Sequence, residues 1–433
     1  MSREPGDPYV STVPSTPSWL PDPESGAGIR AAWGLLAFLT LLNVLNFVDR
    51  MLIAALAPLL MADLGLSRAQ IGLLAGFGFV VFYTFVGLLL GLAADRWRRI
   101  PLVSAGLALW SAMTAISGWA RSFVQLALPR IFVGVGEATL TPSALSMLGD
   151  VFPPHRLAMA TGVYYAGIPL GTAVGFIASS YIAPRYGWRA CFFALGALGV
   201  VAAALLLRVR EPARRGARAA AERPPLGRLF ADVARAVVAQ RELAWTLLGG
   251  SMLCYGAGSA LHAVTWLVED RGFAYSDAAF TAGVVAIFAG FFGNLAGGAF
   301  GDWCARRFPH GHLWSLIPMT AFFVPASLLF YSLPARSPWF YLCWPLAAAG
   351  TSAWFGPLFA AIQELAPRHV RASAVAVALL VINLLGVGPG PLITGMIGDR
   401  WGLTAGLLSS LVVVAASAVP FFLAARRAPA PRT

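Results

Sequence analysis

The stretch RIFVGVGEATLTP, Arg130–Pro142, places an arginine and a glutamate inside a long apolar run. LALP precedes it and SALSML follows it, so the whole segment is apolar enough to cross a membrane. A charged side chain at the centre of a membrane helix costs about 2.5–3.5 kcal/mol on insertion scales. The two charges therefore need an explanation if the chain is a membrane protein, and the composition decides that point.

The composition is that of a membrane protein. Of the 433 residues, 58% are hydrophobic and 12% are charged, against about 45–50% and about 25% in soluble proteins. Apolar runs long enough to cross a bilayer as α-helices recur along the chain, without the alternation typical of membrane β-strands. We therefore predict an all-α membrane protein with twelve transmembrane helices, at about 33–61, 69–94, 101–119, 123–150, 157–183, 190–208, 243–267, 277–300, 313–333, 338–363, 372–397 and 403–424.

The 31 basic residues are all arginines, and their positions predict the orientation of the chain. With the N-terminus inside, the inner gaps carry most of them, nine in residues 208–241 alone, whereas the outer gaps carry seven in all. Arginine accumulates in cytoplasmic loops, so both termini are expected in the cytoplasm of a multi-pass protein of the plasma membrane, or of the bacterial inner membrane. The net charge of +12 then reflects topology, and a nucleic-acid partner is not expected.

The longest charged interruption, between residues 208 and 242, divides six spans from six. The halves also repeat, because GLAADRWRR (91–99) is echoed by GAFGDWCARR, which ends at Arg307. Two similar halves joined by a basic loop predict two pseudo-symmetric six-helix bundles with a substrate site between them. The expected divisions are a disordered cytoplasmic tail at 1–31, an N-terminal bundle at 32–208, a basic cytoplasmic linker at 209–242, a C-terminal bundle at 243–424 and a cytoplasmic tail at 425–433.

One loop motif carries a family resemblance. Gly91, Asp95, Arg96 and Arg99 are similar to the Gly-x-x-x-Asp-Arg-x-Gly-Arg motif of the major facilitator superfamily, with Arg98 in place of the usual glycine. The resemblance implies the major facilitator fold, in which helices one, four, seven and ten line a central cavity.

Three further stretches resemble the Spinster family within that superfamily. They are NFVDR (46–50), RIFVGVGEA (130–138) and AGIPLGTAVGF (166–176). The first two are shared with organic-anion symporters, and the third favours Spinster. This resemblance implies an amphiphilic substrate with a charged head and one acyl-like tail, such as a lysophospholipid or a sphingoid phosphate.

Four charged residues are expected at the cavity: Asp49, Arg50, Arg130 and Glu137. At 1.5 Å per residue, Asp49 lies at a depth between Arg130 and Glu137, which are two turns apart on one helix face. Charges inside a membrane normally face a cavity and pair. Burial and a nearby guanidinium shift a carboxyl pKa in opposite directions, so a rearrangement can load or unload a proton. Asp49 or Glu137 is expected to carry that proton, and Arg130 to pair with it or with an anionic head group; alternatively, the cluster only ties helices one and four together.

Other residues receive more local roles. A cytoplasmic gate that latches one conformational state is expected from Asp95, Arg96, Arg99, Asp150 and Arg156. Further cavity residues are Asn46, His262, Trp354 and Phe355, although His262 fits the outer rim equally well. The histidines at 310, 312 and 369 lie in basic loops and are expected to face water. Scattered cysteines without C-x-x-C spacing indicate free thiols, and no cofactor or metal is expected.

The sequence therefore predicts a secondary carrier that works by alternating access and is coupled to protons. No H-E-x-x-H or G-x-S-x-G motif is present, and a P-loop is impossible without lysine, so neither an enzyme nor an ATP-driven pump is expected. Organic-anion symport is the alternative function, and a channel or a non-transporting lipid-binding protein is the alternative of a different class. The expected partners are an amphiphile or lysolipid, protons and membrane lipids, and the expected oligomeric state is a monomer.

Overall fold

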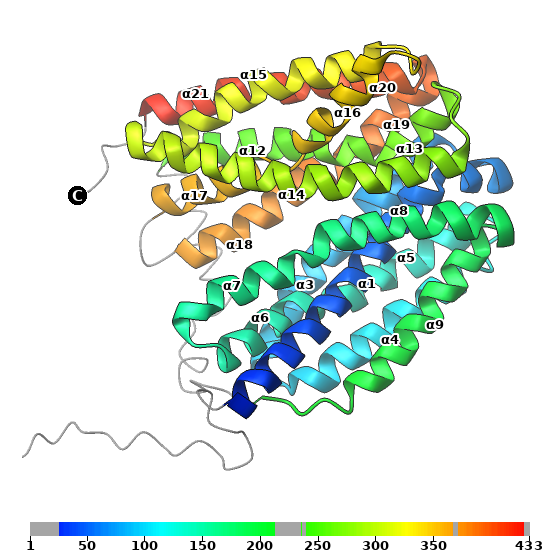
Figure 1. Ribbon diagram of the computed structural model, residues 1–433, viewed down its shortest axis with the longest axis vertical. Helices are drawn as coiled ribbons and strands as arrows, with labels where there is room; N and C mark the ends of the chain where they lie inside the picture. Colours follow the sequence, from blue (N-terminus) through cyan, green and yellow to red (C-terminus); the bar gives the residue numbers. More distant parts are fainter. Residues whose placement is uncertain (1–25, 213–234, 236–239, 367–370, 428–433) are drawn as a thin grey trace, which may run out of the picture.

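The structure, a computed structural model, describes residues 26–212, 235, 240–366 and 371–427. Within these ranges the side chains of 26–28, 88, 89, 91–96, 154 and 371–373 are not described. The described chain forms helices, which are arranged in two halves that follow one another in the sequence (Figure 1). The expectation of an all-α fold is therefore confirmed.

The first half packs around a long helix, α1, whose buried face carries leucines at 36, 39 and 42. Leucine at these spacings forms an apolar stripe on a helix, which buries against its neighbours. The elements of this half are α1 (Gly26–Leu64), α2 (Arg68–Gly72), η1 (Leu73–Phe77), α3 (Gly78–Arg96), α4 (Arg99–Ser117), α5 (Phe123–Glu137), α6 (Leu140–Val151), α7 (Pro154–Tyr165), α8 (Gly167–Tyr186) and α9 (Trp188–Leu206).

The second half has its own buried clusters, one of which includes Leu316, Leu358 and Phe421. Its elements are α12 (Arg241–Ser259), η2 (Ala260–His262), α13 (Ala263–Glu269), α14 (Tyr275–Arg307), α15 (Gly311–Ser332), α16 (Pro338–Ala349), α17 (Phe355–Leu365), α18 (Arg371–Ile382), η4 (Asn383–Val387), α19 (Pro389–Trp401), α20 (Leu403–Ala416) and α21 (Ala418–Arg427). Here η1 and η4 are π-helical turns, which are frequent at functional sites, and they pack against each other.

Ten helical segments of the described chain are long and apolar enough to cross a membrane. The two expected spans that are not among these ten segments, 243–267 and 338–363, are broken into shorter helices. The first is interrupted by the 3-10 turn η2, and the second by residues 350–354 between α16 and α17. Pro357 gives a physical reason for the second break, because proline lacks an amide hydrogen and its ring collides with the carbonyl four residues earlier.

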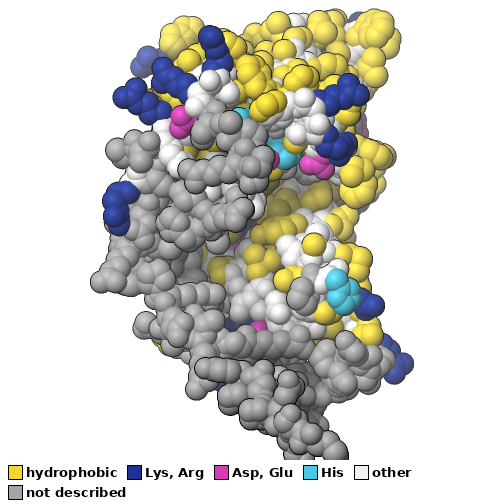
Figure 2. Space-filling view, turned by 90° about the vertical axis from the view of Figure 1, so that its left-hand side faces the viewer, with side chains coloured by type: hydrophobic (Ala, Val, Ile, Leu, Met, Phe, Trp, Pro, Cys, Tyr) yellow, Lys and Arg dark blue, Asp and Glu magenta, His cyan; other side chains and the backbone are white. Residues whose placement is uncertain are grey.

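The two ends of the molecule differ in how the halves meet. At the end that holds the Leu64–Arg68 turn, the far end, α2 packs on α19 and α1 packs on α13. At the opposite end, the linker end, α9 ends and α12 begins, and Figure 1 shows the halves diverging towards it. α8 and α14 join the halves along one side. Figure 2, which views the linker end, shows arginine side chains gathered on it.

Close packing inside each half depends on glycine. Gly106 on α4 and Gly136 on α5 lie against each other, and a methyl group at Gly136 would stand 2.9 Å from Trp110 Cβ and closer still to the Gly106 carbonyl. Small residues allow such backbone approach between membrane helices. Gly162 on α7, by contrast, has nothing within 4 Å of the same position.

Gly136→Ala should therefore destabilise the protein, because overpacking a tight contact costs about 1–3 kcal/mol. Gly162→Ala is the matched control and should be neutral or slightly stabilising, since alanine is the better helix former. Thermal unfolding of the purified variants, followed by fluorescence-detected size-exclusion chromatography, gives the comparison. Equal midpoints for the two variants would contradict the assigned packing.

Candidate functional site

Two ion pairs join α1 to α5 in the interior of the first half. Arg130 donates from one terminal nitrogen to Asp49 Oδ1 at 2.7 Å, and Arg50 Nε donates to Glu137 Oε2, also at 2.7 Å. Asp49, Arg130 and Glu137 are each at most 4% exposed, whereas the Arg50 side chain retains 17% exposure. The structure thus brings together the four charged residues that the sequence singled out, and pairs each acid with one base.

The pairing follows from helix geometry. Asp49 and Arg50 are consecutive, so their side chains leave α1 about 100° apart. Asp49 points towards α4, where the Thr114 hydroxyl donates a short hydrogen bond to its second oxygen. Arg130 and Glu137 are two turns apart on one face of α5, so each meets a different member of the α1 pair. The second terminal nitrogen of Arg130 also donates to the Arg50 carbonyl at 3.3 Å.

Aromatic rings surround the two guanidinium groups. Arg50 Cζ lies 4.9 Å from the centre of the Phe47 ring, 5.2 Å from that of Phe79 and 4.1 Å from that of Tyr83. Arg130 Cζ lies 4.9 Å from the same Phe79 ring, so one phenyl ring contacts both cations. A desolvated cation over an aromatic face gains about 2 kcal/mol. Phe79 therefore helps to hold the two arginines, although sequence reasoning did not single it out.

Several buried polar atoms of this region have no hydrogen-bond partner among the described residues. They are Glu137 Oε1, Arg130 Nε and the side-chain nitrogen of Asn46. Asp49 differs from Glu137, because both of its oxygens accept hydrogen bonds. A buried unpaired polar atom is costly, so Glu137 is the acid whose surroundings leave most room for a change of protonation or partner.

The other expected cavity residues lie apart from the four charges. His262 is buried, and its Nε2 donates to the Pro391 carbonyl at 2.8 Å within the second half. Trp354 is buried in the core of that half, and Phe355 beside it is exposed. No hydrogen bond between described residues joins these three to the α1–α5 ion pairs.

The expected gate is only partly described. The side chains of Asp95 and Arg96 lie outside the described residues. Arg99 is fully buried at the linker end, where it pairs closely with Asp150 and donates to the Pro212 carbonyl at 2.8 Å. Ser146 and Glu211 also contact it, the latter through the Arg99 amide at 2.8 Å. Arg99 thus joins α4, α6 and the segment after α9 within one half.

A histidine occupies the corresponding place in the second half. His312 Nδ1 lies 2.6 Å from Glu364 Oε1, and its Nε2 lies 3.4 Å from Asp302 Oδ1. Asp302 belongs to the repeat of the motif that contains Asp95. The His312 side chain is only 13% exposed, so the expectation that it faces water is wrong. The sequence places His312 in a basic loop and does not indicate that α14 and α17 each bring a carboxylate to its ring.

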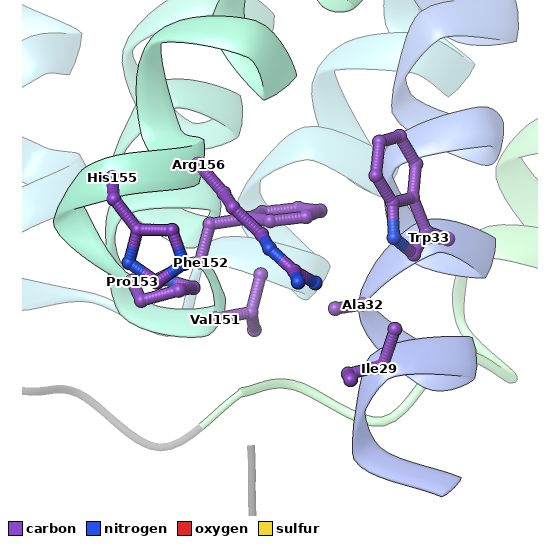
Figure 3. A pocket seen from close by; sticks show the side chains of 8 residues that line it. All are labelled: Ile29, Ala32, Trp33, Val151, Phe152, Pro153, His155 and Arg156. Atoms are coloured by element: carbon purple, nitrogen blue, oxygen red, sulfur yellow. The ribbon is translucent and has the colours of Figure 1, made fainter. Parts of the chain in front are cut away.

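Arg156 lines a cavity of about 240 Å³ at the linker end. Figure 3 shows its guanidinium directed towards α1, near Trp33, which contacts Phe152 edge-on at 5.5 Å between ring centres. The lining residues are Ile29, Ala32, Trp33, Val151, Phe152, Pro153, His155 and Arg156. Arg156 is exposed, and no hydrogen bond or ion pair between described residues joins it to the Arg99–Asp150 pair, so the expected gate residues form no single bonded cluster among the described side chains.

Comparison with known proteins shows which family the chain belongs to. The sequence profile described as Major Facilitator Superfamily matches residues 39–389. The chain belongs to the Major Facilitator Superfamily. Because this family consists of transporters, the expectations of a transporter and of no enzymatic activity are both confirmed.

The relatives of this chain are transporters, and their names give different substrates. An "MFS-type efflux pump" of Mycolicibacterium smegmatis is 32% identical over 86% of each chain. A "Hexuronate transporter" of Bacillus subtilis is 27% identical over 90% of this chain and 94% of that one. A "Sphingosine-1-phosphate transporter" of Xenopus tropicalis is 26% identical over 86% of this chain and 74% of that one.

A solved structure relates the superfamily member to Spinster. A bacterial homologue of the human lysosomal transporter Spinster, in an inward-facing and unoccupied conformation, superposes with a TM-score of 0.80 and 26% identity. The match covers 92% of this chain and 97% of that one. The resemblance to the Spinster family is therefore confirmed.

Arg130→Lys should impair transport although it keeps the charge. One ammonium cannot reproduce the fork that bonds both Asp49 and the Arg50 carbonyl. Arg130→Ala should be inactive while still inserting, because it leaves a buried carboxylate without its partner. Flux per correctly inserted molecule measures both variants. Near-normal flux in Arg130→Ala would return Arg130 to a purely structural role.

Phe79→Leu should lower flux per inserted molecule roughly tenfold, because both guanidinium groups lose their aromatic contact and their ion pairs become less well positioned. Phe82→Leu, on the same helix, is the matched control, since Phe82 is 39% exposed. Both variants are measured in the same transport assay. A similar loss in the two variants would show that α3 responds to any lost phenyl ring.

Proposed function

We propose that this protein is a proton-coupled carrier that moves an amphiphilic lipid, such as a lysophospholipid or a sphingoid phosphate, by alternating access. The observation that carries the proposal is the pair of buried ion pairs, Asp49–Arg130 and Arg50–Glu137, inside a membrane transporter. In this proposal twelve spans form two bundles, counting the two broken segments as spans. The linker end, with both termini, faces the cytoplasm, as the arginine bias favours.

Glu137 is the better candidate for the proton carrier. One of its oxygens accepts from Arg50 and the other has no described partner. A proton on Glu137 removes the charge that holds Arg50, so the guanidinium becomes available to another anion. Arg50 is also the most exposed of the four side chains. Proton loading at Glu137 and anion binding at Arg50 are thereby coupled through one ion pair.

The head group of the substrate is expected to carry a phosphate. Arginine holds phosphate through two parallel N–H bonds, and the hydrogen bond that Arg50 donates to Glu137 comes from Nε rather than from a terminal nitrogen. The acyl-like tail would lie against apolar side chains between the halves. The relative that transports sphingosine-1-phosphate and the structural match to a Spinster homologue support this substrate class.

Organic-anion symport is the second candidate, because a carboxylate pairs with arginine in the same geometry and one relative is a hexuronate transporter. A channel or a non-transporting lipid-binding protein would not need an ion pair that rearranges in each transport cycle. Saturable flux with counterflow separates a carrier from both of these.

Purified protein in liposomes tests the proposal. A lysophospholipid, a sphingoid phosphate and a hexuronate are offered separately, with and without an imposed pH gradient. Gradient-driven, saturable movement of either lipid supports the proposal. Movement of the hexuronate alone would establish the symport alternative, and binding of lipid without movement would exclude a carrier.

Glu137→Gln should abolish the response to the pH gradient while leaving expression near normal, because glutamine keeps the shape but cannot exchange a proton. Asp49→Asn should reduce flux with a smaller effect on that response, since Asp49 is held by Arg130 and Thr114. Initial rates at several pH differences give the comparison. A wild-type pH response in Glu137→Gln would remove the proton-carrier assignment from that residue.

A further inference from the structure

Hydrogen bonds that cross between the halves concentrate at one point of the far end. Between described residues of the two halves, they all start from Arg68 or Ala69 at the beginning of α2. The partners are Glu269, at the end of α13, and Gly398 and Asp399, in the last turn of α19. Because α2 belongs to the first half and α13 and α19 to the second, these bonds connect the bundles directly.

Asp399 completes the start of a helix in the other half. Ser67 and Gln70 form a local capping box, which bonds the Gln70 and Ser67 amides. The remaining amides of the first turn, those of Arg68 and Ala69, donate to the two oxygens of Asp399 at 2.9 and 3.0 Å. Such first-turn amides have no partner within their own helix, and a carboxylate there also complements the helix dipole.

Arg68, in the first half, in turn bonds groups of the second half. Its guanidinium donates to Glu269 at 2.7 and 3.0 Å and to the Gly398 carbonyl at 3.1 Å. That carbonyl lies in the last turn of α19, where a cation complements the dipole of the helix end. Each half therefore satisfies terminal backbone groups of the other.

Glycines bring the two helix ends close enough for this exchange. A methyl group at Gly395 would collide with the backbone of Arg68, and one at Gly72 would collide with the Pro391 carbonyl. Backbone therefore packs directly on backbone beside the hydrogen bonds of Arg68 and Asp399. The contact is also specific, because a small displacement removes all of the bonds together.

The sequence around Asp399 repeats a motif from the other end of the molecule. GMIGDRW (395–401) matches GLAADRW (91–97) at glycine, aspartate, arginine and tryptophan. Both copies end a helix, α19 and α3 respectively. α3 belongs to the membrane segment that starts at Arg68 at the far end, so Asp95 lies where that segment ends, at the linker end. Asp399 lies where α19 ends, at the far end.

We propose that Asp399 and Arg68 form the far-end latch, a reversible contact that holds the outer side of the transporter closed while the central site is open towards the linker end. This rests on the alternating access of the proposed function. Opening the outer side would separate α2 from α19 and return the three terminal backbone groups, the Arg68 and Ala69 amides and the Gly398 carbonyl, to water. The latch would then re-form at each cycle, when α2 and α19 meet again.

Distances across the far end test the latch without knowledge of the substrate. Spin labels are attached at Arg121→Cys and Arg336→Cys, which are exposed positions in far-end loops of the two halves; the four native cysteines are buried. In Asp399→Ala and in Arg68→Ala, the ratio of long to short distances should rise about tenfold, equivalent to about 1.4 kcal/mol. Glu269→Gln should shift this ratio less, because the ion pair between Glu269 and Arg68 is partly exposed to water.

Two acids at the same end serve as matched controls. Asp270 accepts the Thr404 amide at 2.9 Å within the second half, and Asp63 pairs with Arg189 at 2.7 Å within the first. Asp270→Ala and Asp63→Ala should leave the distances unchanged. A shift as large as that of Asp399→Ala in either control, or no shift in Asp399→Ala and Arg68→Ala, would overturn the latch.

The milder Asp399→Asn keeps the test available if Asp399→Ala fails to fold, because asparagine still accepts one of the two amides. It should give a smaller shift in the same direction, and an unchanged ratio in that variant would overturn the latch. Far-end opening in a protein that moves none of the offered solutes would support the latch and refute the proposed substrate class. Unchanged distances together with intact proton-driven lipid transport would refute the latch alone.

Discussion

The ion pairs between α1 and α5 remove four charges from water and place them where an uncompensated charge is prohibitively expensive. Much of the first half is arranged around that constraint. α4 supplies Thr114 to the second oxygen of Asp49, and α3 supplies Phe79 to both guanidinium groups. The glycine contact between α4 and α5 brings the hydroxyl and the charges within reach of one another. Stability and chemistry at this site therefore depend on the same contacts.

Sequence reasoning reached the site through helix periodicity and failed where contacts depend on rotation or tertiary packing. Depth along a helix follows from 1.5 Å per residue, so Asp49 could be placed at a depth between Arg130 and Glu137. Which acid pairs with which base depends on how α1 is rotated about its own axis. A continuous apolar sequence does not indicate that rotation. Thr114 and Phe79 look like ordinary membrane-helix residues. The break before Pro357 was readable from its proline, yet the apolar run around it favoured one continuous span.

The contacts at the far end and those in the middle of the molecule differ in what it costs to break them. In the middle, charged side chains are held in a dry interior, where each partner is hard to replace. At the far end, Arg68 and Asp399 bond backbone groups that water can serve equally well once the halves part. A contact of that kind is specific in register but inexpensive to open, whereas the ion pairs are expensive to disturb without a proton or a ligand. The sequence showed neither Arg68 nor Asp399 as a site, because their pairing spans the whole chain.

His312 gives the two linker-end clusters different chemistry. The imidazole ring of His312 places Nδ1 against Glu364 and Nε2 against Asp302, so each ring nitrogen serves one acid. Arg99, its counterpart in the first half, carries five donors in a planar fork, and these contact Asp150, Ser146, Glu211 and the Pro212 carbonyl. One bundle is thus fastened at this face by a side chain that bonds four groups, and the other by a ring that contacts two. Loss of one acid would leave His312 with a single partner and Arg99 with three, so two halves of similar architecture depend unequally on any one contact at this face.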